Sequence, residues 1–242
     1  MLKIKLVTVI LISMLSSSLF AEEFAFVKGE RAAFDMKRDK TSKAQTVIDM
    51  AELKQGMIVA DVLGGGGYYS ELIGKEVGTS GKVYLHNNKA YMPWIEKELV
   101  ARLKGDRLSN VIRHDREADN LDFAPESLDV IFFVLGYHDL YHVADGWKID
   151  KDDFLSQLTK ALKSNGKLII IDHSAVDGSN TKYSQKLHRI DKQFVKTELT
   201  EKGFTFIKES NLLANMEDTR LITPFKPEIR RNTDRFILIF KK

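Results

Sequence analysis

The stretch that decides the fold of this 242-residue chain is VADVLGGGGYYSELIG, residues 59–74. An apolar run reaches Asp61, four glycines follow at 64–67, and a helical pattern begins near Tyr68. This order predicts a buried strand, a loop and a helix. Four glycines cost conformational entropy that a simple turn does not require, so they favour a loop whose backbone a ligand approaches closely. A tight turn alone is the competing interpretation.

The segments on either side continue the alternation of strands and helices. Apolar runs predict strands at 57–63, 82–86, 110–114, 127–135, 167–172, 204–210 and 234–240. Helical patterns lie at 28–54, 69–77, 93–104, 151–163 and 183–202. The near-continuous apolar character of the first five strands is typical of a parallel sheet that is covered on both faces. The sequence therefore predicts an open α/β sheet.

The first 21 residues have the composition of a secretory signal peptide. Lys3 and Lys5 precede an apolar segment, and small residues lead to Ala21. This order predicts cleavage after Ala21 and a periplasmic or secreted mature chain, residues 22–242, with no membrane association after cleavage. The apolar segment is shorter than the roughly 20 residues that a membrane span needs. An uncleaved anchor and a buried N-terminal helix are the alternatives.

Composition excludes several classes of function. Removal of residues 1–21 takes away two lysines and lowers the net charge from +3 to +1, which gives no electrostatic case for nucleic acid. The absence of cysteine excludes disulfides, thiolate metal sites and a cysteine nucleophile. The mature chain has the length of one domain and contains no internal repeat. We expect a small-molecule substrate, and no feature specifies an oligomeric state.

The glycine run does not match the common nucleotide-binding loops. In the dinucleotide pattern G-x-G-x-x-G, counted from Gly65, the third glycine position is occupied by Ser70. The phosphate-loop pattern requires a Lys-Ser or Lys-Thr pair after the glycines, and none follows. A nucleotide loop of either kind is therefore disfavoured.

The spacing resembles instead the first motif of class I S-adenosylmethionine-dependent methyltransferases, an acidic residue followed by glycines at +2, +4 and +6. Asp61, Gly65 and Gly67 match this motif, and Leu63 stands where the first glycine usually lies. The mature chain also resembles a group of predicted exported methyltransferases, through its basic segment 28–54 and the motifs GGGGYY, YHDLYH and NTDRFILIF.

The resemblance implies a Rossmann-like methyltransferase sandwich with a seven-stranded, mostly parallel sheet and an antiparallel last strand. It implies S-adenosylmethionine as the cofactor and methyl transfer to an unidentified small-molecule or exported acceptor. In the wider class the acidic residue helps to hold the methionine end of the cofactor, and Asp61 inherits that role. The backbone at Gly64, Gly65 and Gly67 would approach the carboxypropyl and ribose parts.

Two further cofactor contacts follow from the resemblance. An acidic residue after the third strand accepts from the adenine amino group, and Asp115 has that position. An acidic residue normally ends the second strand and binds the ribose hydroxyls, whereas this chain has Asn87 there. Asn87 can hydrogen-bond a diol, but without the charge-assisted bonds of a carboxylate. This is the largest departure from the class pattern. For Asp115, a surface acid is the alternative.

Histidines cluster after the predicted fourth and fifth strands. His138 and His142 follow the fourth strand, His173 ends the fifth, and His188 lies in the next helical segment. The carboxyl ends of parallel strands meet at one edge, beside the predicted cofactor. We predict His138 first and His173 second as the base that takes the acceptor's proton, because the pKa of histidine suits that task. Each is alternatively a structural hydrogen-bonding residue.

Asp139 and Asp172 are candidate orienting partners for that base. Two other functions remain open. Leu63, the missing acid at Asn87 and export away from the cytoplasmic cofactor pool favour a non-catalytic binding module on the same fold. The four-residue spacing of His138 and His142 suits two metal ligands on one helical face. Asp139 or His173 would complete that site, as in a metal-dependent hydrolase, although the leading prediction includes no metal.

Overall fold

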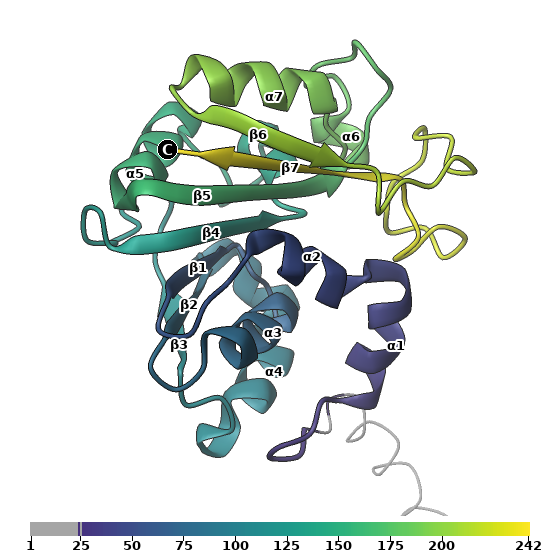
Figure 1. Ribbon diagram of the computed structural model, residues 1–242. Helices are drawn as coiled ribbons and strands as arrows, with labels where there is room; N and C mark the ends of the chain where they lie inside the picture. The colour runs from purple at the N-terminus through teal and green to yellow at the C-terminus, as the bar shows by residue number, and fades with distance from the viewer. Residues whose placement is uncertain (1–23, 25) are drawn as a thin grey trace, which may run out of the picture.

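The computed structural model describes residue 24 and residues 26–242, so the predicted signal peptide at 1–21 lies outside the described residues. Its centre is a seven-stranded sheet with the order β3-β2-β1-β4-β5-β7-β6 (Figure 1). The strands are β1 (Ile58–Val62), β2 (Lys82–Asn87), β3 (Val111–Asp115), β4 (Leu128–Val134), β5 (Leu162–His173), β6 (Thr205–Ser210) and β7 (Arg235–Lys241). The last strand, β7, runs antiparallel to both β5 and β6, and the other neighbours are parallel. The predicted fold class is confirmed.

Helices cover both faces of this sheet (Figure 1). They are α1 (Ala33–Ser42), α2 (Ala44–Ala51), α3 (Tyr68–Val77), α4 (Met92–Leu103), α5 (Lys151–Ala161), α6 (Ser184–Leu187) and α7 (Lys192–Glu201). Three short 3₁₀-helices are η1 (Lys89–Tyr91), η2 (Lys104–Asp106) and η3 (Tyr137–Tyr141). Among the described residues, none of the helices has both the length and the apolar content to cross a membrane.

Two hydrophobic clusters form the core, one on each face of the sheet. Buried side chains of α2, α3 and α4 form one of them, and those of α5 and α7 form the other. Strand β1 contributes to both clusters, because successive side chains point to opposite faces of the sheet. Val59 packs in the cluster with α2, α3 and α4, and Ala60 packs in the cluster with α5 and α7. This two-sided burial explains why the parallel strands read as continuous apolar runs.

Strand register brings the loops that follow β1, β2, β3 and β4 to one edge. Asp61 of β1 lies beside Leu85 of β2 and Phe132 of β4, and Asn87 of β2 lies beside Asp115 of β3. In open α/β sheets, ligands bind at this carboxyl edge of the strands. The predicted site residues therefore come from the edge of the sheet where a ligand is expected.

The predicted single helix at 183–202 is wrong. The segment divides into α6 and α7, with His188 in the left-handed region at φ 51°. The break places Arg189 in the interior, where its guanidinium binds Asp218 and the carbonyl oxygens of Ser174 and Ile222. The side chain of Asp191 then caps α7. These long-range contacts outweigh the local helical pattern.

The predicted helix at 151–163 is two residues too long. Helix α5 ends at Ala161, and Leu162 begins β5 by pairing with Leu128 of β4. The register then shifts before Val130 pairs with Lys167. The Asn165-Gly166 pair, which looked like a helix stop, therefore lies within the irregular first part of a strand.

Candidate active site

The glycine loop connects the carboxyl end of β1 to the first turn of α3. A Cβ at Gly64 would lie 2.7 Å from the carboxyl of Asp61, and one at Gly66 would lie 2.3 Å from the carboxyl carbon of Glu98. Gly67 has a φ of 85°, which favours glycine. At Gly65, by contrast, the nearest atom to such a Cβ is 3.9 Å away. Packing within the chain explains Gly64 and Gly66. A positive φ explains Gly67 and also Gly65, where φ is 60° and a Cβ would make only an ordinary van der Waals contact with Ile95.

Asp61 is a buried carboxyl group with one unsatisfied oxygen. Its Oδ2 accepts a hydrogen bond of 2.6 Å from the Ser70 hydroxyl. Its Oδ1 is buried and has no hydrogen-bond partner among the described residues. Burial raises the pKa of Asp61 to about 6, against the opposing effect of the Ser70 hydrogen bond. A buried, half-satisfied carboxyl group at this edge suits a cationic ligand.

Asn87 holds the glycine loop. Its Oδ1 accepts from the backbone N–H of Gly65 at 2.9 Å, and its Nδ2 donates to the carbonyl of Gly65 at 3.0 Å. An amide retains one N–H and one lone pair beyond these two bonds. The ribose contact assigned to Asn87 therefore stays a prediction, and the structure adds a role in fixing the loop.

Asp115 lines a surface hollow of about 530 Å³ at the ends of β2 and β3. The other lining residues are Lys89, Met92, Arg116, Glu117, Asp119 and Asn120. Asp115 accepts from Arg113 Nε at 2.6 Å through Oδ2, whereas its Oδ1 is buried and has no partner among the described residues. An oxygen of this kind suits an amino donor such as that of adenine.

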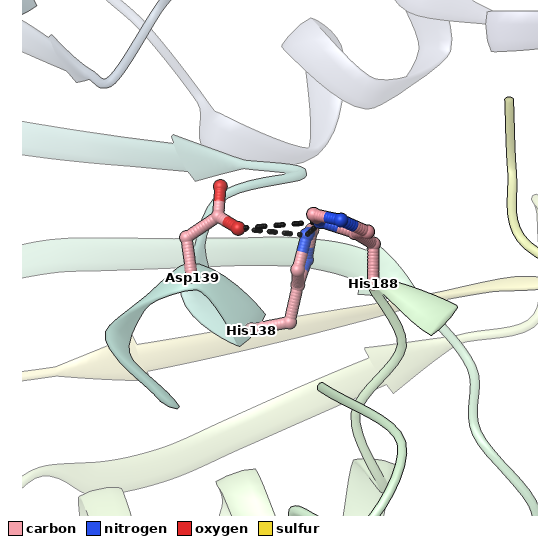
Figure 2. Close-up of side chains that lie close together, drawn as sticks. All are labelled: His138, Asp139 and His188. Carbon is pink, nitrogen blue, oxygen red and sulfur yellow. Dashed lines mark hydrogen bonds and ion pairs between the residues drawn. The ribbon is translucent and has the colours of Figure 1, made fainter. Parts of the chain in front are cut away.

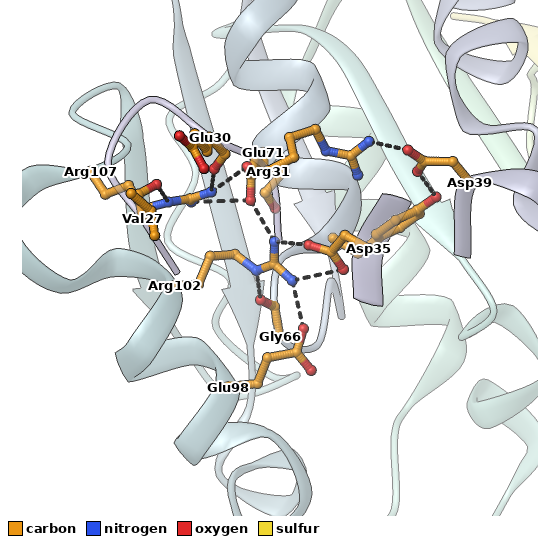
Figure 3. A network of polar contacts seen from close by, with 12 residues as sticks. Val27, Glu30, Arg31, Asp35, Asp39, Gly66, Glu71, Glu98, Arg102 and Arg107 are labelled. Atoms are coloured by element: carbon orange, nitrogen blue, oxygen red, sulfur yellow. Dashed lines mark hydrogen bonds and ion pairs between the residues drawn. The ribbon is translucent and has the colours of Figure 1, made fainter. Parts of the chain in front are cut away.

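Arg102 of α4 fixes the glycine loop from behind (Figure 3). Its Nε donates to the carbonyl of Gly66 at 2.5 Å. Its other nitrogens bind the carboxylates of Asp35 at 2.6 Å, Glu71 at 2.5 Å and Glu98 at 2.6 Å. The Arg102 side chain is completely buried. One guanidinium therefore joins α1, α3, α4 and the loop.

His138, in η3, is held by a carboxylate on each ring nitrogen. Its Nδ1 lies 2.7 Å from Asp172 Oδ1, its backbone N–H donates to Asp172 Oδ2 at 2.8 Å, and its Nε2 lies 3.2 Å from Asp139 Oδ1. Burial favours a lower pKa, but the two carboxylates outweigh it and raise the pKa of His138 to about 10. Burial favours a higher pKa for Asp139, yet His138 keeps that pKa well below its usual range.

His188 completes a cluster with His138 and Asp139 (Figure 2). Its Nδ1 lies 3.3 Å from His138 Nε2 and 3.5 Å from Asp139 Oδ1. His142 lies outside this cluster, with its ring centroid 4.8 Å from that of His188. The hypothesis of a metal-ligand pair of His138 and His142 is not supported, because residues 137–141 form a 3₁₀-helix in which i and i+4 do not share a face.

His173 lies beside this cluster, with its ring centroid 6.1 Å from that of His138. Its Nδ1 is 2.7 Å from the Thr233 hydroxyl. Among the described residues, no hydrogen bond engages its Nε2. Burial lowers the pKa of His173 well below its usual value. The structure thus brings both predicted base residues to the carboxyl edge, with their pKa values shifted in opposite directions.

Tyr91, which follows β2, contacts the segment that follows β4 at the carboxyl edge of the sheet. Its hydroxyl donates to Asp139 Oδ2 at 2.7 Å, and its ring stacks on Trp147 with centroids 5.1 Å apart. Trp147 Nε1 in turn donates to the backbone carbonyl of Asp139 at 2.9 Å. Neither aromatic residue was predicted from the sequence, nor was Arg102. Local patterns do not signal Tyr91 or Arg102, since Tyr91 contacts Asp139 across 48 residues of the chain and Arg102 contacts Asp35 across 67.

The class I methyltransferase fold is defined by a sheet with this strand order and by a glycine loop after the first strand, which carries an acidic residue near its end. The sequence agrees: the model of the ubiE/COQ5 methyltransferase family matches residues 32–207, and the chain belongs to this family. The expectation of a class I S-adenosylmethionine-dependent methyltransferase is confirmed, with S-adenosylmethionine as the cofactor of the class.

Curated relatives are ubiquinone/menaquinone biosynthesis C-methyltransferases (UbiE). The protein from Methylococcus capsulatus is 30% identical over 130 residues, which are 53% of this chain and 48% of the relative. The protein from Legionella pneumophila (strain Corby) is 29% identical over 128 residues, 52% of this chain and 47% of the relative. The alignments thus span about half the length of these relatives.

Solved structures share the fold at low sequence identity. An S-adenosylmethionine-dependent methyltransferase from Aquifex aeolicus has a TM-score of 0.62 at 21% identity, covering 85% of this chain and 92% of that one. Geranyl diphosphate C-methyltransferase from Streptomyces coelicolor has a TM-score of 0.57 at 13% identity, covering 88% and 86%. These likenesses support the fold alone.

The residues of this chain fit the cofactor of the class. Asp61 and Asp115 each present a buried carboxyl oxygen that is unpaired among the described residues. The backbone at Gly65 belongs to the loop that follows Asp61, and a Cβ added there would make only an ordinary van der Waals contact, with Ile95. Asp61 would hold the ammonium group of S-adenosylmethionine, Gly65 would lie against its central part, and Asp115 would accept from its adenine. The bound cofactor would supply an electrophilic methyl group.

Proposed function

We propose that this chain transfers the methyl group of S-adenosylmethionine to a small-molecule acceptor. The observation that carries the proposal is Asp61, a buried carboxyl group with an unsatisfied oxygen beside the glycine loop. Such a group is costly in the free protein, and a cationic ligand offsets that cost. Family membership supports the same conclusion.

For the acceptor we propose a hydroquinone ring. The support is the name of the curated relatives, which are C-methyltransferases of ubiquinone and menaquinone biosynthesis. In the reaction, a ring carbon would attack the methyl carbon as the bond from methyl to sulfur breaks and its electrons remain on sulfur. The ring then loses one proton to a base. Alignment of the three reacting centres supplies much of the acceleration.

A transfer assay tests this function. Residues 22–242 are incubated with methyl-labelled S-adenosylmethionine and a demethylated hydroquinone with a short isoprenoid chain, and the product is identified by mass spectrometry. We expect one labelled methyl group per product, and about 100-fold less product with Asp61→Asn. Asp177→Asn is the matched control, because the Asp177 side chain is 92% exposed. Cofactor binding without turnover on any hydroquinone or phenol would instead support a non-catalytic binding module.

His138 and His173 remain the proposed bases. His138 has both ring nitrogens engaged, whereas Nε2 of His173 has no hydrogen bond among the described residues. Replacing the true base with alanine should lower kcat about 100-fold or more and leave the affinity for S-adenosylhomocysteine within threefold. His142→Ala is the control. Full turnover in both His138→Ala and His173→Ala would show that neither residue is the base.

We also propose export, with cleavage after Ala21. The support is the basic, apolar and small-residue order of residues 1–21. Fractionation of cells that express the full-length chain with a C-terminal tag tests this directly. We expect the tagged protein outside the cytoplasm with Glu22 as its first residue. A cytoplasmic protein with an intact N-terminus would contradict export.

A further inference from the structure

Three ligand-type atoms meet in the histidine cluster. They are Nε2 of His138, Oδ1 of Asp139 and Nδ1 of His188, and the distances between them are 3.2, 3.3 and 3.5 Å (Figure 2). We propose that these three residues bind one divalent transition-metal ion of the first row.

The triangle has the right size for such an ion. Metal bonds of about 2.1 Å place neighbouring ligand atoms about 3.0 Å apart at octahedral angles and about 3.4 Å apart at tetrahedral angles. The observed distances of 3.2, 3.3 and 3.5 Å extend from the middle of this range to just beyond it. An ion could therefore sit over the centre of the triangle with little movement of the side chains.

Hydrogen bonds with neighbouring residues also orient two of the three proposed ligands, His138 and Asp139. Asp172 occupies Nδ1 of His138, which turns Nε2 toward Asp139 and His188. Tyr91 donates to Oδ2 of Asp139, and this leaves Oδ1 facing the two imidazoles. Hydrogen bonds of this kind, which a ligating histidine donates to a carboxylate, are the usual support of metal sites. Asp172 and Tyr91 would act as positioning residues. With an ion on Nε2 and Asp172 on Nδ1, His138 would have no free ring nitrogen, and His173 would then be the base of the proposed transfer.

The donor set indicates the kind of ion. Two imidazole nitrogens and one carboxylate oxygen suit zinc, ferrous iron, cobalt or manganese, whereas magnesium and calcium prefer oxygen ligands. All three atoms would lie on one side of the ion. The other coordination positions would be available to water or to an oxygen atom of the acceptor. That last role rests on the proposed function, but the metal binding itself does not.

Cobalt provides a direct test. Residues 22–242, purified without a metal-affinity tag and stripped with chelator, are titrated with Co²⁺ while visible absorption is recorded, and Zn²⁺ is added in competition. We expect one ion per chain and a saturable cobalt spectrum that zinc abolishes. His188→Asn should weaken binding about 100-fold. His142→Asn, which alters the neighbouring imidazole outside the triangle, should stay within threefold of wild type.

Two results would overturn the proposal. One is the absence of saturable Co²⁺ absorption in the wild-type protein, since the three residues would then form only a hydrogen-bonded cluster. The other is unchanged affinity in His188→Asn. Asparagine tolerates the left-handed backbone at position 188, so this variant should fold, and its thermal unfolding without metal checks that. Binding of S-adenosylhomocysteine by the same variant is measured separately, which distinguishes failure of the metal site from failure of the proposed function.

Discussion

Asp61 is a residue that lowers the stability of the folded protein and is proposed to bind the cofactor. Its carboxyl group is buried, and the Ser70 hydroxyl donates the one side-chain hydrogen bond it accepts among the described residues. Its pKa of about 6 in the folded protein lies above the ordinary value of 3.8. The folded state therefore binds this proton more tightly than the unfolded state between these two pH values. Stability from this group is greatest below about pH 4 and falls as the pH rises to about 6.

This linkage predicts the behaviour of Asp61→Asn. At pH 7 the substitution should raise the free energy of unfolding by up to about 3 kcal/mol, because it removes a buried charge. Near pH 4 the gain should nearly vanish, since the carboxyl group of the wild-type protein is then protonated in the folded state. Urea unfolding of both proteins at the two pH values measures this. A difference that does not change with pH would contradict the assignment.

Local motifs predicted individual residues better than their contacts. The positions of Asp61 and Asp115 at strand ends followed from the motif and the apolar runs, because both signals lie within a few residues. The pairing of Asn87 with Gly65 depends on β1 lying beside β2, and no local pattern encodes it. The same holds for Tyr91, which reaches Asp139 across the sheet edge.

At the scale of elements, Arg102 connects three helices to the glycine loop. Its guanidinium carries the positive charge that Asp35 and Glu71 face in the interior (Figure 3). Removal of Arg102 is costly, because Asp35 would stay buried without an ion-pair partner among the described residues. Glu71, by contrast, would keep its ion pair with Arg107. The conformation of the cofactor loop should therefore depend on this side chain.

We predict that Arg102→Met lowers the free energy of unfolding by about 3–5 kcal/mol. Arg113→Met is the matched control and should cost at most about 1 kcal/mol, because solvent reaches both members of its ion pair with Glu96, whose side chains are 33% and 46% exposed. Urea unfolding at pH 7 measures both. Equal effects of the two substitutions would show that the buried network does not hold the loop.

The predicted helix boundaries were wrong where contacts with distant parts of the chain determine them. The break between α6 and α7 is imposed by the burial of Arg189 against Asp218. The early end of α5 is imposed by pairing of Leu162 with Leu128. Periodicity describes only which face of a segment is apolar, so it does not reveal where a strand partner interrupts a helix.

For the whole molecule, the strand pattern predicted an open α/β sheet, and the family resemblance implied its seven strands and its antiparallel last strand. Seven apolar runs of strand length, separated mostly by helical segments, matched the seven observed strands. The strand order also predicted that histidines from several segments meet at the carboxyl edge, and His138, His173 and His188 do meet there. The sequence did not predict which of these histidines contact one another, because those contacts depend on the 3₁₀ geometry of η3 and on the helix break at His188.

The central claim is that the glycine loop, Asp61 and Asp115 bind S-adenosylmethionine. Titration calorimetry of residues 22–242 with S-adenosylhomocysteine tests it most directly, because this product reports binding without turnover. We predict one saturable site per chain, weakened about 100-fold or more by Asp61→Asn and unchanged by Asp177→Asn. Absence of a binding isotherm in the wild-type protein, or equal affinity in Asp61→Asn, would contradict the account.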